Sequence, residues 1–202
     1  MLSFRRLVWF PFLLGADPAF AHAPIPGIKG FYTGLIHPFS TPAQALLILG
    51  LGLLIGGLAV EKIRWNWGTF SVSLLAGLIA GSNSLEVDAM MFASAFAACS
   101  VAALFPGRLM QVAIVLSAIG GVLIGSVSIP DDGELQDRII TMSGSIVGAS
   151  IGLLYIFGLL LVVRERYTWP WVGTALRIVA AWVGAIALLM LALQSVQNGT
   201  PA

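Results

Sequence analysis

Long apolar runs separated by short polar connections make up most of the chain after residue 41. Six runs of spanning length lie at 42–60, 68–84, 87–105, 109–129, 139–163 and 172–194. Each is continuous and about 17 to 25 residues long, the length of a helix that crosses the hydrocarbon core of a bilayer. They lack the polar alternation that a transmembrane barrel needs. The pattern predicts an all-α integral membrane protein, a compact bundle of about six transmembrane helices over residues 42–194.

The N-terminus has the layout of a secretory signal. Two arginines, Arg5 and Arg6, precede a short apolar stretch at 7–14, and Ala19-Phe20-Ala21 matches an A-x-A cleavage site. The alternative is an uncleaved signal anchor, which we disfavour because so short a stretch, interrupted by Pro11, would span the bilayer poorly.

This layout divides the chain into four parts. We expect a signal peptide at 1–21, a periplasmic N-terminal segment at 22–41, the transmembrane domain at 42–194 and a C-terminal tail at 195–202. Cleavage would leave His22 as the mature N-terminus. Proline and glycine are frequent in the segment at 22–41, so it can fold back over the outer mouth of the bundle.

Charged residues between the runs predict the orientation. The basic residues of alternate connections are Lys62, Arg64, Arg108, Arg164, Arg166 and Arg177. Opposite them lies the acidic segment 131–137, with only Lys29 and Arg138 as basic residues on that side. Because cytoplasmic loops are enriched in lysine and arginine, we expect the bacterial inner (cytoplasmic) membrane with the mature N-terminus periplasmic. The tryptophans beside the basic residues are interpreted as interfacial anchors in the lipid bilayer.

Composition excludes several classes of function. Hydrophobic residues make up 58% of the chain and charged residues 9%, with a mean hydropathy of +0.97. The formal net charge of +1 provides no basic surface for nucleic acid. The single Cys99 rules out an internal disulfide and is interpreted as a small packing residue. We find no H-E-x-x-H or phosphate-binding G-x-x-x-x-G-K motif, and we expect a protein that is not an enzyme.

Small residues recur at every fourth position in several runs. The rows are Gly52 and Gly56, Gly77 and Gly81, Gly121 and Gly125, Gly144, Gly148 and Gly152, and Ala89, Ala93 and Ala97. Such rows let helix backbones approach closely. We favour packing within the bundle, and the alternative is the interface of a homo-oligomer.

Few side chains could bind a ligand. After signal cleavage His22 would offer both an α-amine and an imidazole, and His37 follows near the start of the first run. Together with Glu86 and Asp88, and with Gln44 as a weak oxygen ligand, they would form a mixed nitrogen and oxygen site for a divalent transition metal such as nickel, cobalt or copper. Alternatively, each is an isolated interfacial residue, with Glu86 and Asp88 stabilising a helix N-terminus.

At these positions the chain resembles the HupE/UreJ family of hydrogenase- and urease-associated membrane proteins, regarded as nickel or cobalt permeases. The family pattern H-P-x-x-G-x-D-H-L-L-A-M-x-x-V-G matches the chain without a gap from His37-Pro38 to Gly52. An acidic step into the third helix looks like Leu85-Glu86. The glycine spacing of H-G-x-A-H-G is kept at 120–125, and L-H-x-x-G looks like 154–158.

The departures concern the family's metal ligands. Its Asp and His after the first His-Pro are Ala43 and Gln44 here, and its later histidines are Gly120, Ile124 and Tyr155. The family's intramembrane ligands therefore do not carry over, and only His37 and Glu86 do, with His22 as a third. Past the entrance, a transported ion would depend on backbone carbonyls and on Ser117, Ser126, Ser143, Ser145 and Ser150.

Two hypotheses follow from the resemblance. In the first, the chain is a divergent permease that captures a divalent metal ion outside, holds no tightly bound cofactor, and passes the ion through the bundle. In the second, it keeps the fold but serves as a non-transporting subunit or scaffold of a larger membrane complex. Such a protein would keep the glycines that pack the helices and lose the metal ligands, as this chain does.

Overall fold

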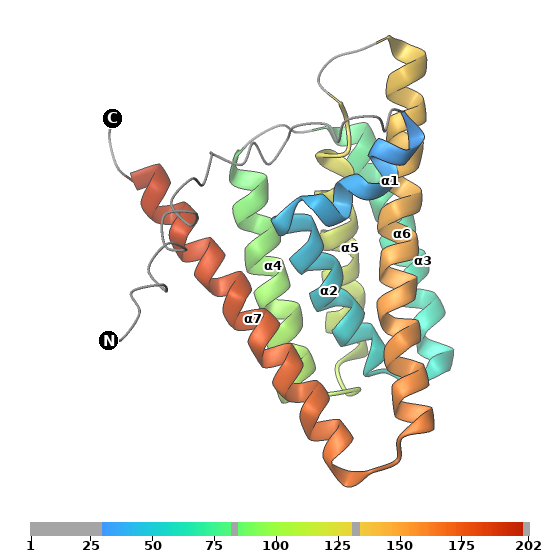
Figure 1. The fold of residues 1–202 in the computed structure, drawn as a ribbon, viewed down its shortest axis with the longest axis vertical. Coiled ribbons are helices and arrows are strands. Elements are labelled where there is room, and N and C mark those ends of the chain that lie inside the picture. Colours follow the sequence, from blue (N-terminus) through green and yellow to red (C-terminus); the bar gives the residue numbers. More distant parts are fainter. Residues whose placement is uncertain (1–29, 82–84, 131–133, 200–202) are drawn as a thin grey trace, which may run out of the picture.

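The fold is described for residues 30–81, 85–130 and 134–199 by a computed structural model, and in these residues it consists of seven α-helices without a strand (Figure 1). The helices are α1 (Phe31–Ser40), α2 (Pro42–Gly56), α3 (Val60–Ala80), α4 (Leu85–Leu104), α5 (Met110–Ser126), α6 (Leu135–Arg166) and α7 (Pro170–Gly199). The all-α prediction is confirmed. Each of the six apolar runs overlaps one of the helices α2 to α7, although the bounds differ, while the predicted signal peptide and His22 lie outside the described residues.

Three of these helices are long and apolar enough to cross a membrane. They are α4, α6 and α7, and a fourth span is obtained if the bent pair α1 and α2 counts as one. Helix α5 is apolar but shorter, and α3 begins with a charged turn. Large apolar side chains on the outer surface are exposed, such as Ile79 at 87% and Trp182 at 69%. Lipid suits such a surface, because soluble monomers rarely expose extended apolar patches.

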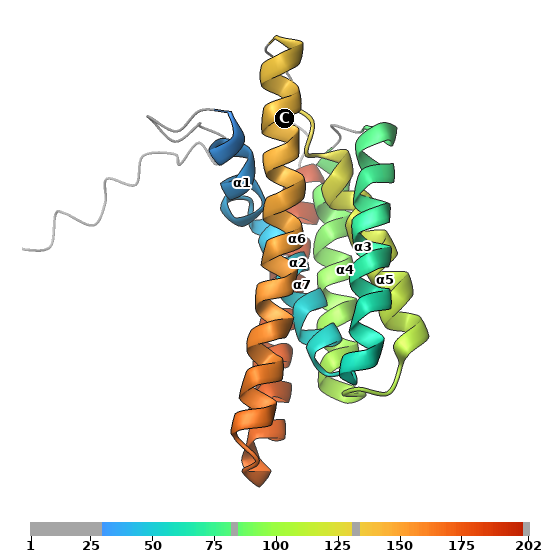
Figure 2. The same ribbon diagram turned by 90° about the vertical axis from the view of Figure 1, so that its right-hand side faces the viewer.

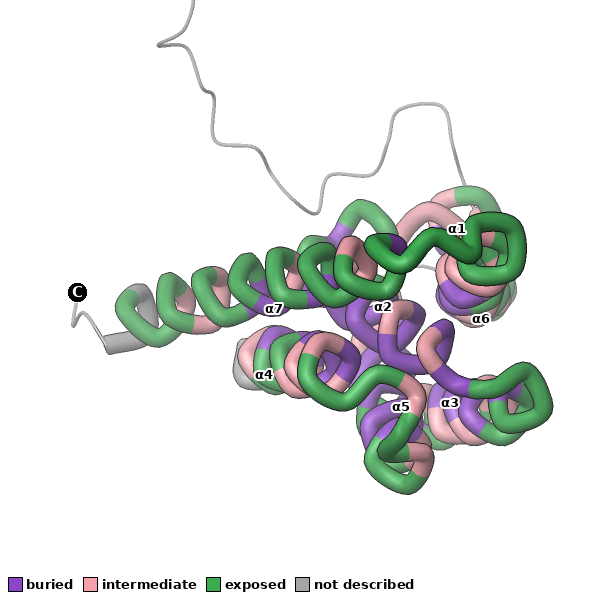
Figure 3. Tube along the Cα trace, turned by 90° about the horizontal axis from the view of Figure 1, so that it is seen from below, coloured by how far each residue is buried: buried purple, intermediate pink, exposed green. Residues whose placement is uncertain are grey.

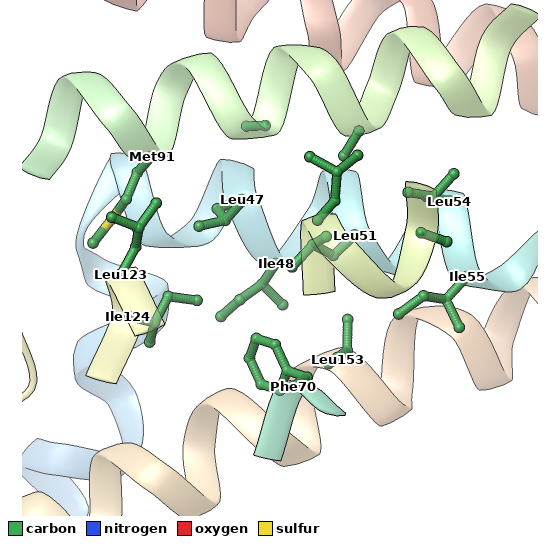
Figure 4. Close-up of a cluster of buried hydrophobic side chains, with 14 of the residues drawn as sticks. Leu47, Ile48, Leu51, Leu54, Ile55, Phe70, Met91, Leu123, Ile124 and Leu153 are labelled. Carbon is green, nitrogen blue, oxygen red and sulfur yellow. The ribbon is translucent and has the colours of Figure 1, made fainter. Parts of the chain in front are cut away.

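Helix α2 lies at the centre of the bundle, with buried residues along most of its length (Figure 3). It packs against α4 on one side and α6 on the other. Its leucines and isoleucines form the core together with Phe70, Ile124 and Leu153, which come from α3, α5 and α6 (Figure 4). The interior between the two ends of the bundle is therefore filled by apolar side chains.

The connections alternate between the two ends of the bundle. In Figure 1 the α2–α3, α4–α5 and α6–α7 connections lie at the lower end, whereas α3 and α5 end and α4 and α6 begin toward the upper end. The six basic residues that we assign to the cytoplasmic side are thus near the lower end. The bend between α1 and α2 lies in the upper half.

Glycine rows lie where helices of this chain touch. A Cβ at Gly121 or Gly125 would collide with the backbone of α3, at Phe70 and Leu74. Gly144 and Gly148 face the backbone of α1 in the same way. Figure 2 shows α3 beside α5 and α1 beside α6. This contact pattern confirms packing within the bundle for these rows.

The alanine row of α4 is different. Ala93 is exposed, and the buried face of α4 is formed instead by Met91, Ala95, Ala98 and Cys99. Cys99 is fully buried and lies against Gly50 and Gly184, which confirms its interpretation as a small packing residue.

Candidate metal-binding site at the bend between α1 and α2

The bend is a consequence of the sequence Ser40-Thr41-Pro42. A residue before proline avoids the helical region, and Thr41 accordingly adopts an extended conformation with φ −96° and ψ 115°. Pro42 suits the first position of α2, where no intrahelical partner for its nitrogen is needed. The axes of α1 and α2 differ by 75°. His37 lies in the last turn of α1 and therefore just before this bend.

Helix α1 is held against α6 by a polar contact as well as by the glycines. Pro38 has no N–H, so the carbonyl of Gly34 loses the donor that a continuous helix would provide. The hydroxyl of Ser145 on α6 donates to this carbonyl at 3.2 Å. Since Gly34 and Ser145 are both buried, the contact replaces a hydrogen bond that water does not reach.

The structure brings two of the predicted ligands together. The side-chain amide Nε2 of Gln44 lies 3.4 Å from Nε2 of His37, and it donates when the imidazole carries its proton on Nδ1. Gln44 is only 1% exposed, whereas His37 is half-buried. Two oxygen atoms of residues at the bend, Oε1 of Gln44 and Oγ1 of Thr41, are buried without a hydrogen-bond partner among the described residues. The bend thus combines an imidazole nitrogen with two buried oxygens that have unused bonding capacity.

The other predicted ligands are placed only in part. Asp88 is half-buried in the first turn of α4, which begins at the upper end of the bundle where the bend also lies (Figure 1). Glu86 precedes it on the same helix, but its side chain is outside the described residues, as is all of His22. Within residues 30–81, 85–130 and 134–199, no group of three or more His, Cys, Asp or Glu side chains could hold a metal ion. The five-residue set remains a prediction.

Three of the five serines on the predicted ion path donate to backbone carbonyls. Ser126 and Ser143 donate to carbonyls three residues earlier in their own helices, and Ser145 donates to α1. Ser117, by contrast, is fully buried, and its hydroxyl has no partner in the part of the chain that the structure describes.

Asn66 on α3 is a second buried polar residue near Ser117. Its Nδ2 donates to the carbonyl of Lys62, but its Oδ1 finds no partner within the described ranges, and the residue is 0% exposed. Gly121 and Gly125 on α5 lie against Phe70 and Leu74, so one turn earlier Ser117 comes opposite Asn66. Asn66 and Ser117 therefore form a buried polar level between α3 and α5, within the core, since Ile63 and Ala113 one turn earlier are buried as well.

Sequence reasoning missed Thr41 and Asn66. The predicted run began at residue 68, which left Asn66 in a connection, whereas α3 begins at Val60 and carries Asn66 inward. A helical interpretation of 60–67 would have placed Asn66 one turn before Phe70 on the same face. Thr41 could have been found from its position between His37 and Gln44.

Comparison with known proteins adds no relative. No protein-family model, curated protein or solved structure matches the chain.

Proposed function

We propose that the chain is a HupE/UreJ-like membrane permease for a divalent transition-metal ion of the nickel or cobalt class. The observation that supports the proposal most directly is the contact between His37 and Gln44, at two positions of the family's first motif. Gln44 stands where the family has histidine, and it remains buried beside His37 with an unpartnered oxygen. Keeping such an oxygen costs about 1 to 3 kcal/mol, which a binding function would justify.

Capture would begin with a neutral imidazole. Rotating the Gln44 amide by half a turn presents Oε1 next to the imidazole nitrogen, so that one metal ion can take nitrogen and oxygen ligands together. His22, Glu86 and Asp88 would complete the entrance and supply negative charge. The level formed by Asn66 and Ser117 would supply oxygen atoms further along, beyond Leu47, Leu51 and Phe70.

Metal binding by the purified protein in lipid nanodiscs tests the capture site. We expect His37→Ala to abolish binding of Ni²⁺ or Co²⁺ in titration calorimetry and uptake into proteoliposomes. Gln111→Ala is the matched control, because Gln111 is exposed at the first turn of α5, at the other end of the bundle. Unchanged affinity and uptake in His37→Ala would reject the proposed function.

A loss of metal binding could also result from misfolding, so a second test uses a variant that should bind metal more tightly. Gln44→His restores the family's histidine seven residues after His37, and a second imidazole is a better ligand than an amide for nickel or cobalt. We expect the affinity to rise by about tenfold or more, equivalent to about 1.4 kcal/mol. An affinity equal to that of the parent protein would argue against His37 and Gln44 sharing an ion.

The filled interior favours a second candidate, a non-transporting subunit or scaffold of a membrane complex. Leu47, Leu51 and Phe70 are fully buried between the bend and the level of Asn66 and Ser117. A stoichiometric membrane partner after purification in mild detergent, without metal binding by either component, would support this candidate over the permease.

A further inference from the structure

A cavity of about 560 Å³ lies at the lower end of the bundle, opposite the bend. It is open on one side and is lined by the ends of α2, α4 and α6, the start of α7 and the connection between α6 and α7. Two basic side chains line it, Arg164 from α6 and Arg177 from α7. Neither belongs to the proposed capture site.

Both guanidinium groups are held in place by backbone carbonyls. Nη1 of Arg164 donates to the carbonyl of Gly56 at 2.7 Å, and Nε of Arg177 donates to the carbonyl of Ala103 at 2.7 Å. A guanidinium has five N–H donors, so each retains several for a ligand. Among the described residues, the hydrogen bonds of both side chains go to backbone carbonyls and not to a carboxylate. Both side chains are also exposed, so the cavity has two oriented positive charges that a ligand can reach.

The N-terminus of α7 contributes to the same cavity. Pro170, Val172, Gly173 and Thr174 belong to its first turns and line the wall. Pro170 has no N–H and the N–H of Val172 is bonded to the carbonyl of Trp169, so the helix dipole and the other N–H groups of the first turn make this helix start favourable for an anion. The start of α7 and the two arginines therefore contribute separately, and both favour an anion in the cavity.

The remaining wall suits an acyl chain rather than water. Leu53, Leu160 and Leu176 line the cavity, and Trp169 lies at its edge, where α6 joins α7. Tryptophan next to arginine is typical of the headgroup level of a membrane. The cavity thus offers positive charge and apolar surface side by side, which is the chemistry of an anionic phospholipid.

We propose that this cavity binds the phosphate of an anionic phospholipid, with Arg164, Arg177 and the start of α7 around the phosphate and the leucines along the acyl chain. Basic pockets between helices at the cytoplasmic side bind such headgroups in other membrane proteins. The site does not depend on the proposed transport function. It would fix the ends of α2, α6 and α7 relative to one another.

Lipid exchange in nanodiscs tests the site. Phosphatidylglycerol is titrated into protein in phosphatidylcholine nanodiscs, and bound lipid is counted by native mass spectrometry. We expect Arg164→Gln and Arg177→Gln each to weaken retention by about fivefold, the equivalent of about 1 kcal/mol per charge. Arg166→Gln is the matched control, because Arg166 lies at the same helix end but does not line the cavity. Equal retention in all three variants would overturn the proposal.

A second pair of variants tests the cavity without changing any charged residue. Gly173 lines the cavity and has open space where a side chain would begin, as does Gly158 of α6, which is outside the cavity. Gly173→Leu should fill the cavity and abolish retention of phosphatidylglycerol, while Gly158→Leu should leave it unchanged. Retention by Gly173→Leu equal to that of the parent would contradict the proposed site.

Inorganic phosphate at millimolar concentration distinguishes the lipid from a soluble ligand. If phosphate displaces the lipid, and phosphate alone raises the melting temperature as much as the lipid does, the cavity binds a soluble phosphate instead.

Discussion

Individual polar atoms in the apolar interior either hold two helices together or have bonding capacity left for a ligand. The Gly34 carbonyl is released by Pro38 and satisfied by Ser145, so its contact is structural. The side-chain oxygens of Gln44, Asn66 and Ser117 have no such partner among residues 30–81, 85–130 and 134–199. Because a buried polar group without a partner is costly, the two kinds of residue should respond oppositely to substitution.

Removing the Ser145 hydroxyl should destabilise the protein. Ser145→Ala leaves the buried Gly34 carbonyl unpaired, and we expect a loss of about 1 to 3 kcal/mol in the free energy of unfolding. Denaturant titration in detergent micelles, followed by tryptophan fluorescence, measures it. Ser143→Ala is the control, since its exposed hydroxyl bonds only within its own helix. Equal effects of the two variants would show that the contact between α1 and α6 contributes nothing.

Removing the Ser117 hydroxyl should not destabilise the protein, in contrast to removing the Ser145 hydroxyl. Ser117→Ala deletes an unpartnered buried oxygen, so its melting temperature should equal or exceed that of the parent. If Ser117 serves ion transit, uptake of Ni²⁺ should fall while the affinity of the outer site stays constant. Ser71→Ala, on a hydroxyl already bonded to the carbonyl of Trp67, should change neither quantity. Unchanged uptake in Ser117→Ala would remove it from the path.

At the scale of helices, small residues rather than polar contacts set which pairs lie together. The α3–α5 and α1–α6 pairs approach through glycine, where a side chain would meet backbone atoms that cannot move aside. Dispersion across these contacts is what holds helices together where lipid is as apolar as the helix surface.

Substitution of Gly121 should separate α3 from α5. A Cβ there would collide with the Phe70 carbonyl, so Gly121→Val should cost about 3 kcal/mol or more, at the upper end of overpacking penalties. Gly68→Val is a stringent control, because a Cβ added at Gly68 would have no neighbouring atom within 4 Å. Thermal unfolding of both variants in the same detergent measures the difference. A melting temperature of Gly121→Val no lower than that of Gly68→Val would show that α3 and α5 are not in close contact.

Hydropathy located α2 to α7 because each contains a long apolar run. It missed α1, whose ten residues include Gly34 and Pro38 and which is stabilised by packing on α6 rather than by its own sequence. It also began α3 eight residues late, since Glu61, Lys62 and Arg64 interrupt the apolar pattern although they belong to the helix. The His37 and Gln44 pair was accessible from sequence, but its geometry depends on the bend at Thr41, which spacing alone does not define.

For the whole molecule, the charge distribution and the helix order agree. The basic connections and the Arg164–Arg177 cavity lie at one end of the bundle, while the bend with His37 and the start of α6 lie toward the other (Figure 1). A positive end facing the cytoplasm would place the proposed capture site on the side from which an ion arrives and the lipid site in the inner leaflet. Both proposals therefore depend on the orientation of the bundle in the membrane.

Cysteine labelling in intact cells tests this orientation. In a Cys99→Ala background, Glu134→Cys introduces an exposed thiol just before α6, and Arg166→Cys introduces one at its other end. Both positions are exposed, so they differ mainly in the end of the bundle at which they lie. Because positive residues stay in the cytoplasm, a membrane-impermeant maleimide should label Glu134→Cys from the periplasm and Arg166→Cys only after the inner membrane is opened. The reverse pattern would invert the bundle and place His37 and Gln44 on the cytoplasmic side, where they could release an ion but not capture one from outside.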